Sequence, residues 1–191
     1  MAEDIWTDNL VTILGKIKDL RRRGWIKRDV CSPESDADHM YSVAVEVLLM
    51  APPDLDRCHC LELALTHDLP EVYSSDFTPG EIPAEEKHAL EQAAAQRLAV
   101  ELNFPKLAEW FNEYEEQSSP EARFVRCLDK MDNIVTAAYY EREGRTDWPV
   151  VSEFSARTLD NLAQIGGNGR DACIQVVRQI VKTSEKRKKH E

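Results

Sequence analysis

Residues 57–71 read RCHCLELALTHDLPE, and this stretch indicates both the fold class and the position of a functional site. Its apolar residues recur at the spacing of one helical face: Cys60, Leu63 and Ala64. His67 continues that face toward the interior, Asp68 follows directly, and Pro70 ends the pattern. Consecutive helical residues point about 100° apart, so only the end of a helix lets both side chains reach one point. The stretch therefore predicts a helix that ends in a paired histidine and aspartate.

Helical spacing continues along almost the whole chain, and no segment alternates as a strand would. We therefore expect an all-α protein, a compact single domain of six to eight helices. The expected helices span 4–22, 36–50, 54–67, 83–102, 105–116, 120–142, 153–164 and 169–184. The domain is expected to cover residues 1–184, followed by a charged C-terminal tail at 185–191.

Helix-breaking and capping residues separate these segments. Gly24 is expected to end the first helix, and Ser35 with Asp38 to begin the second as a capping box. Ser119-Pro120 is expected to open the long later helix. Residues 69–82 hold two prolines and a glycine between strong helices, so we expect a loop there, and long ordered loops often carry function.

The composition narrows the class of protein. The 191 residues are 42% hydrophobic, which is enough for the core of one ordinary domain. A formal net charge of -11 opposes a broad basic surface, so polymeric nucleic acid is not an expected partner. No apolar run approaches the ~20 residues of a membrane span, and we expect an intracellular, cytoplasmic protein without membrane contact. The five cysteines are odd in number and are expected to be reduced.

Charged residues that interrupt apolar helical patterns need a partner. Asp129 follows the mostly apolar run 124–128, and His39 lies near the start of a helix. A buried carboxylate is costly unless it is paired or binds a cation. Imidazole and carboxylate together suit manganese, cobalt, iron, zinc or magnesium. Asp132, about one turn after Asp129, is expected to face solvent or to pair with another helix.

The order His39, then His67-Asp68, then Asp129 resembles that of the HD-domain metal phosphohydrolases. The surrounding sequence strengthens the resemblance: RGWI at 23–26, SPESDADH at 32–39, ALTHDLPEVYSSDFTP at 64–79, YEEQSS at 114–119 and FVRCLDKM at 124–131. The similarity covers roughly residues 10–145. Within the family, the chain looks like the small proteins related to bacterial 5′-deoxynucleotidase and eukaryotic HD domain-containing protein 2.

That resemblance implies the helical HD-domain fold and one divalent metal ion held by four residues: His39, His67, Asp68 and Asp129. It also implies that Glu71 and Asp68 are the catalytic carboxylates. A glutamate one turn from the ligands can direct or deprotonate an attacking water, or protonate the leaving oxygen. The alternative for Glu71 is an exposed loop carboxylate.

The resemblance further implies residues that bind the substrate. Arg22 or Arg23 is expected to contact the phosphate, with Trp25 beside the sugar. Asp76 and Thr78 are expected to hold the nucleoside. A glycine separates the arginines from the tryptophan here, unlike in the bacterial enzymes, which leaves open which arginine reaches phosphate. The arginine cluster could instead cap a helix C-terminus.

The leading hypothesis is therefore a metal-dependent phosphomonoesterase that hydrolyses (deoxy)nucleoside 5′-monophosphates, and the resemblance implies a homodimer. Two alternatives remain. A di-iron oxygenase with an HD domain would need His88 and a further histidine shortly downstream, but the next one is His190. We expect His88 to lie on a helix surface. A noncatalytic nucleotide-binding protein would keep the pocket but release no phosphate.

Overall fold

The computed structural model describes residues 2–167 and 169–188, and within these ranges the chain forms ten α-helices and no β-strand. They are α1 (Ala2–Asp19), α2 (Arg23–Ile26), α3 (Asp36–Met50), α4 (Arg57–Ala64), α5 (Glu71–Ser74), α6 (Ala84–Glu101), α7 (Lys106–Glu116), α8 (Pro120–Arg142), α9 (Val150–Gln164) and α10 (Arg170–Lys188). The expected all-α class is confirmed. The number of helices in the described ranges is ten, rather than the expected six to eight.

The two additional helices are short. The helices α2 and α5 have four residues each and lie where the sequence predicted a helix end and a loop. Four residues cannot display an amphipathic period, so pattern analysis does not detect such helices. The eight longer helices agree with the expected spans to within a few residues. Helix α10 extends to Lys188, and residues 189–191 lie outside the described residues, so the domain boundary at 184 stays a prediction.

The end of α1 differs from the expectation. This helix ends at Asp19, and Gly24 lies inside α2. The intervening segment pairs with the residues before α3, because Arg22 N–H donates to the Glu34 carbonyl at 3.1 Å and Asp36 N–H donates to the Leu20 carbonyl at 3.0 Å. This backbone pairing ends α1 early, so the arginine cluster is not a cap of that helix.

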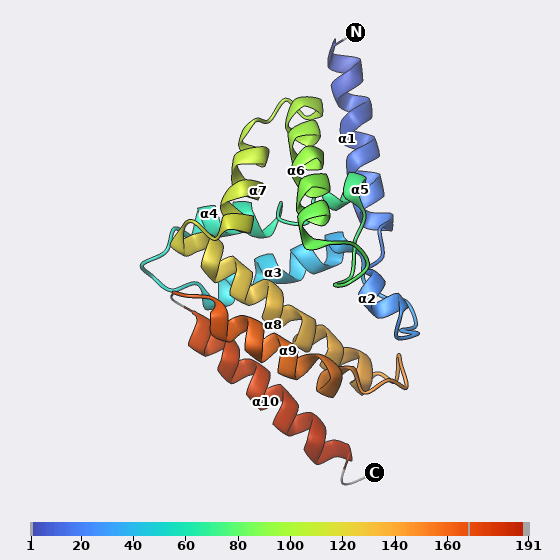
Figure 1. Cartoon of the computed structure of the whole chain (residues 1–191), viewed down its shortest axis with the longest axis vertical. Coiled ribbons are helices and arrows are strands. Elements are labelled where there is room, and N and C mark those ends of the chain that lie inside the picture. Colours follow the sequence, from blue (N-terminus) through green and yellow to red (C-terminus); the bar gives the residue numbers. More distant parts are fainter. Residues whose placement is uncertain (1, 168, 189–191) are drawn as a thin grey trace.

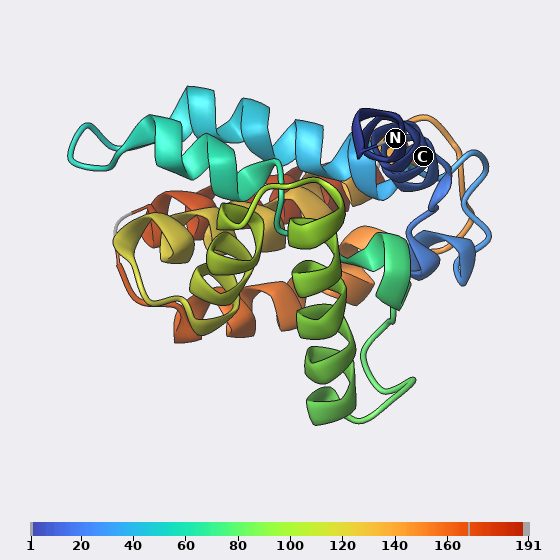
Figure 2. The same ribbon diagram turned by 90° about the horizontal axis from the view of Figure 1, so that it is seen from above.

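Helix α8 is the central helix of the fold (Figure 1). It packs against α3, α4, α7, α9 and α10, and α6 pairs with α7. Viewed from above, α3 and α4 lie along one side of α8, and α9 lies along the other (Figure 2). Because α8 is covered by so many helices, polar side chains in its middle are held inside the protein.

The expected caps set where the site-bearing helices begin. Asp38 N–H donates to Ser35 Oγ at 3.1 Å, and Ser35 N–H donates to Asp38 Oδ2 at 2.9 Å, which completes the capping box of α3. Ser119 caps α8, which begins with Pro120. The capping box places His39 in the first turn of α3.

Buried apolar side chains join the helices in three clusters. The first lies around Phe124 and Leu128 of α8 and includes residues of α3, α4 and α10. The second, around Leu98 and Phe111, joins α1, α3, α6 and α7. The third joins α2 to α8 and α9 around Trp25. Within the described ranges, no helix combines the length and apolar character needed to cross a membrane.

Candidate metal centre and active site

Three helices bring the polar residues of the site together. His39 is on α3, His67 lies in the turn after α4, and Asp129 is in the middle of α8. One potential ligand atom of each lies within 4.8 Å of the others, and all three residues are buried. Asp68 Oδ2 adjoins them, 3.4 Å from His67 Nε2 and 3.7 Å from His39 Nε2. The four residues grouped from the sequence are therefore neighbours in the fold.

Each histidine uses Nδ1 for a protein partner. His67 Nδ1 donates to the Ala64 carbonyl at 2.9 Å, and His39 Nδ1 lies 2.6 Å from Asp132 Oδ2. A proton on Nδ1 leaves the lone pair on Nε2, which is the form that binds metal ions. Burial lowers the pKa of His67 and so favours its neutral form.

The two Nε2 atoms test whether a metal ion fits. Both are buried and have no hydrogen-bond partner among the described residues. An unsatisfied buried polar atom costs free energy, and a cation would remove that cost. Two imidazoles beside the carboxylates of Asp68 and Asp129 are a suitable donor set for a divalent ion such as manganese, cobalt, iron, zinc or magnesium. The residues present fit a metal ion.

Arg22 reaches this group from the segment between α1 and α2. Its Nη1 donates to Asp68 Oδ2 at 3.1 Å, its Nη2 donates to Asn133 Oδ1 at 3.3 Å, and the side chain is 15% exposed. Burial would raise the pKa of Asp68, but the two histidines and Arg22 outweigh burial and lower it to about 2. Asp68 is therefore ionised at neutral pH.

Asp129 has one oxygen held by the protein. Tyr114 Oη donates to Asp129 Oδ2 at 2.6 Å, and Lys130 Nζ lies 2.9 Å from the same oxygen. The other oxygen, Oδ1, lies 3.4 Å from His39 Nε2. These contacts orient the carboxylate toward the histidines. Tyr114 was not predicted to have this role, because nothing in the helical pattern of the sequence pairs it with Asp129.

Glu71 begins α5 and is buried, so it is not an exposed loop carboxylate. Its Oε2 has no hydrogen-bond partner among the described residues. Burial raises the pKa of Glu71 well above its usual value, and nearby carboxylates raise it further: Asp68, Asp36 and Asp76. A raised pKa makes a carboxyl group better suited to act as a general acid.

Glu71 also belongs to a second group of carboxylates. Potential ligand oxygens of Asp36, Glu71 and Asp76 lie within 4.8 Å of one another. Asp36 is fully buried, neither of its carboxylate oxygens has a hydrogen-bond partner in the described part of the chain, and burial raises its pKa to about 7. This group could share a proton or hold a second cation. Asp36 was not predicted to belong to the site, because an aspartate in the first turn of a helix is ordinary.

A cavity of about 600 Å³ opens beside these residues. It is lined by four of the residues predicted to bind substrate: Arg22, Trp25, Asp76 and Thr78. Arg23 is not part of this lining, and its Nη2 donates to Glu81 Oε1 at 2.8 Å. Only one of the two candidate arginines therefore faces the metal ligands.

Trp25 contributes little exposed area to the cavity wall. It is 2% exposed, and its ring meets Tyr140 and Phe154 edge-on, with centroids 5.3 and 5.4 Å away. Its Nε1 donates to Glu34 Oε1 at 2.8 Å. The indole therefore has a structural role in joining α2 to α8 and α9, beside the contact expected with a sugar.

Asp76 and Thr78 connect the segment after α5 to α2. Asp76 Oδ2 accepts from the Arg23 backbone N–H at 2.5 Å, and Lys27 Nζ donates to Thr78 Oγ1 at 2.5 Å. These hydrogen bonds hold the segment against α2 and so form one wall of the cavity.

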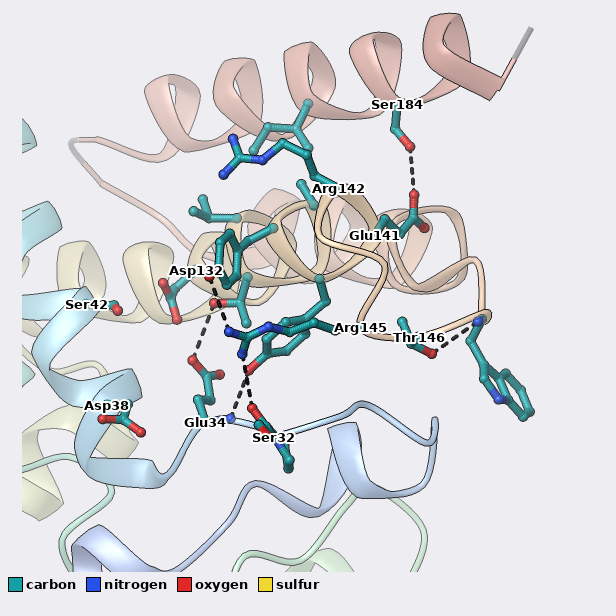
Figure 3. A pocket seen from close by; sticks show the side chains of 18 of the residues that line it. Ser32, Glu34, Asp38, Ser42, Asp132, Glu141, Arg142, Arg145, Thr146 and Ser184 are labelled. Carbon is teal, nitrogen blue, oxygen red and sulfur yellow. Dashed lines mark hydrogen bonds between the residues drawn. The ribbon is translucent and has the colours of Figure 1, made fainter. Parts of the chain in front are cut away.

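Asp132 is buried, so of the two roles expected for it the solvent-facing one is wrong, whereas the pairing with another helix agrees with its contact to His39 on α3. It is 1% exposed and contacts His39 Nδ1, whereas Asp129 contacts Nε2 of the same ring. A hollow of about 1470 Å³ between α3, α8 and α10 reaches Asp132, and Glu34 also lines it (Figure 3). Asp132 is nevertheless buried, because the packing of α8 against α3 brings it against His39. Asp132 therefore supports a candidate metal ligand.

We expect Asp132→Asn to weaken metal binding about 10–100-fold, as is typical when the hydrogen-bond partner of a ligand histidine is changed. The substitution keeps the size of the side chain but removes the charge that fixes the His39 tautomer. Competition with a chromophoric chelator would measure the affinity. Asp160→Asn, at an exposed position of α9, is the control. Equal metal affinities for the two variants would show that Asp132 does not support the ligand.

Two other histidines lie outside this group. His88 is exposed, as expected, and its Nδ1 lies 3.9 Å from Glu115 Oε2. His59, between two cysteines, pairs with Glu113 at 2.8 Å. In the described part of the chain, neither histidine joins a cluster of potential metal ligands. The five cysteines are free thiols.

Comparison with known proteins identifies a family match and several similar proteins. A family model described as HD domain matches residues 14–165. The chain is 41% identical over 133 residues to a Bos taurus protein and 40% identical to a Homo sapiens protein, both named 5′-deoxynucleotidase HDDC2. Each match covers 68% of this chain but only 65% of the relative's own length.

Solved structures include a similar fold. The PH0347 protein from Pyrococcus horikoshii OT3 matches with a TM-score of 0.74 at 29% sequence identity. The match covers 90% of this chain and 98% of that chain. Most of the helical arrangement is therefore shared with that protein.

Proposed function

Because the chain belongs to the HD domain family, we propose that it is a metal-dependent phosphomonoesterase that hydrolyses (deoxy)nucleoside 5′-monophosphates. The names of the mammalian relatives support this substrate class. The observation that carries the proposal is the pair of buried Nε2 atoms of His39 and His67, which lie beside two carboxylates and have no hydrogen-bond partner among the residues that the structure describes. The ligands would be His39, His67, Asp68 and Asp129.

A divalent ion at these ligands would polarise the phosphoryl group and lower the pKa of a bound water. Arg22, rather than Arg23, would contact the phosphate, because it lines the cavity and touches Asp68. A guanidinium presents paired donors that match phosphate oxygens. The oxygen of a water molecule would bond to phosphorus while the ester phosphorus–oxygen bond breaks, and the water's proton would leave to solvent. Glu71 would donate its proton to the departing 5′ oxygen, which releases the nucleoside and inorganic phosphate.

The direct test is a phosphate-release screen across ribo- and deoxyribonucleoside mono-, di- and triphosphates, repeated with manganese, cobalt, magnesium and zinc. We expect release from the monophosphates only in the presence of a divalent metal, because the four ligands need the ion. Preferred cleavage of triphosphates would contradict the proposal. Tight nucleotide binding without release under any metal would favour a noncatalytic binding protein.

The proposal extends to one divalent ion per chain, with manganese, cobalt, magnesium, zinc or iron as candidates, and to a homodimer. The resemblance described above supports both. Metal analysis and sedimentation of the same preparation would test them together. Two irons per chain with an oxygen requirement would instead favour the oxygenase alternative, which the exposed position of His88 disfavours.

A further inference from the structure

Lys87 lies on the wall of the candidate active site but belongs to none of the groups described so far. It is in the first turns of α6, which packs against α5, the helix that begins with Glu71. Its side chain lines the same cavity as Arg22 and Asp68. Lys87 Nζ lies 4.0 Å from Glu71 Oε1, which is beyond hydrogen-bond length. The ammonium group is therefore close to the reacting region without being bound to the catalytic carboxyl.

Glu91 holds this ammonium group in place. Glu91 lies four residues after Lys87 on α6, and its Oε1 is 2.8 Å from Lys87 Nζ. The Glu91 side chain is 9% exposed and the Lys87 side chain is 34% exposed. A buried carboxylate thus fixes the position of a partly exposed lysine. The ammonium group has three N–H donors, and Glu91 accepts from one of them. Donors remain available on the cavity side.

Two other cations that line the cavity are paired with residues of the metal site or beside it. Lys130 Nζ is 2.9 Å from Asp129, a proposed metal ligand. Arg126 Nη1 donates to Glu115 Oε1 at 3.0 Å, and its guanidinium lies over the Tyr114 ring. In a cavity rich in carboxylates, a cation in addition to the metal ion and Arg22 would favour the binding of a phosphate dianion. Lys87 has the position and the free donors for that role.

We propose that Lys87 contacts the substrate phosphate from α6 and that Glu91 is its positioning residue. The inference rests on the proposed function and adds a second protein cation to the phosphate site. Arg22 comes from the segment between α1 and α2, whereas Lys87 comes from α6. The phosphate would therefore be bound by parts of the chain on two walls of the cavity, and inorganic phosphate, the product, would use the same contacts.

The test compares Lys87→Met with Lys106→Met, a matched change at an exposed lysine at the start of α7. We expect Lys87→Met to weaken inorganic phosphate binding to the manganese-loaded protein about 10–100-fold, the usual effect of losing a charge-assisted hydrogen bond. Titration calorimetry would measure this dissociation constant. The KM of the best nucleotide from the screen should rise in parallel, and Lys106→Met should change neither value.

Two further variants separate contact from structure. Lys87→Arg keeps the positive charge and should restore most of the phosphate affinity. Glu91→Gln should weaken phosphate binding less than Lys87→Met, because the ammonium remains but is less fixed. Thermal melting of each variant would show whether the fold is intact.

The inference and the proposed function can fail separately. Unchanged phosphate affinity in folded Lys87→Met protein would overturn the role of Lys87, even if wild-type protein hydrolyses nucleotides. A wild-type protein that hydrolyses no nucleotide would overturn the proposed function, and the phosphate titration would still decide whether Lys87 binds phosphate. Equal losses in Lys87→Arg and Lys87→Met would also contradict the proposal, because the positive charge alone would not explain them.

Discussion

Asp129→Ala should remove the metal ion and with it nearly all phosphate release. Asp129 lies within the ligand cluster and is oriented by Tyr114 and Lys130, so its loss deletes a ligand and leaves two buried imidazoles without compensation. We expect the metal affinity to fall by more than the ~10–100-fold that follows changes outside the ligand shell. His67→Ala should behave in the same way, because its Nε2 has no hydrogen-bond partner within the described ranges and is available to bind the ion.

The measurement is metal content after gel filtration, followed by phosphate release at saturating metal. Asp160→Ala, at an exposed position of α9, is the matched control and should keep both properties. Full metal occupancy in Asp129→Ala protein would remove Asp129 from the metal centre. It would also require another residue to compensate the buried histidines.

Glu71→Gln should slow phosphate release about 10²–10⁴-fold, the range typical of general acid–base catalysis. Glutamine keeps the size of the side chain but cannot donate the proton that burial and neighbouring carboxylates hold on Glu71. Metal content and nucleotide affinity should stay nearly unchanged, so the loss lies in the transition state. Single-turnover phosphate release, measured beside metal content, would show this.

Each other outcome at Glu71 has a definite meaning. A normal rate with normal metal content would make Glu71 a noncatalytic residue. Loss of metal would instead assign Glu71 to a cation site, as its closeness to Asp36 and Asp76 allows. Glu85→Gln, at an exposed position of α6, controls for the change of residue type and should keep the wild-type rate.

The sequence predicted the long helices well because each buries one face, and burial imposes a period on the residues. It missed α2 and α5 because four residues cannot show that period. It also placed the end of the first helix at Gly24. The actual end depends on backbone pairing between Arg22 and Glu34, which no periodicity encodes.

The helical pattern of the sequence predicted only those residues of the site that stand out in it. His67 and Asp68 were recognisable as adjacent polar residues at the buried end of a helix. Asp132 was expected to face solvent or to pair with another helix, and only the second is correct. Because α8 is surrounded by helices, a position one turn from a ligand is inside the protein. Asp36 and Lys87 become visible only when α3, α5 and α6 are brought together in space.

The candidate ligands at 39, 67 and 129 are far apart along the chain and belong to separate helical segments. An ion that binds them would join these segments to one another, and it could bind only when the segments are correctly packed. Binding to the native state alone adds about 2.7 kcal/mol of stability when free metal is at 100 times its dissociation constant. The lifetime of this protein in a cell would then follow the supply of its metal, and chains made during metal shortage would be the first exposed to proteases.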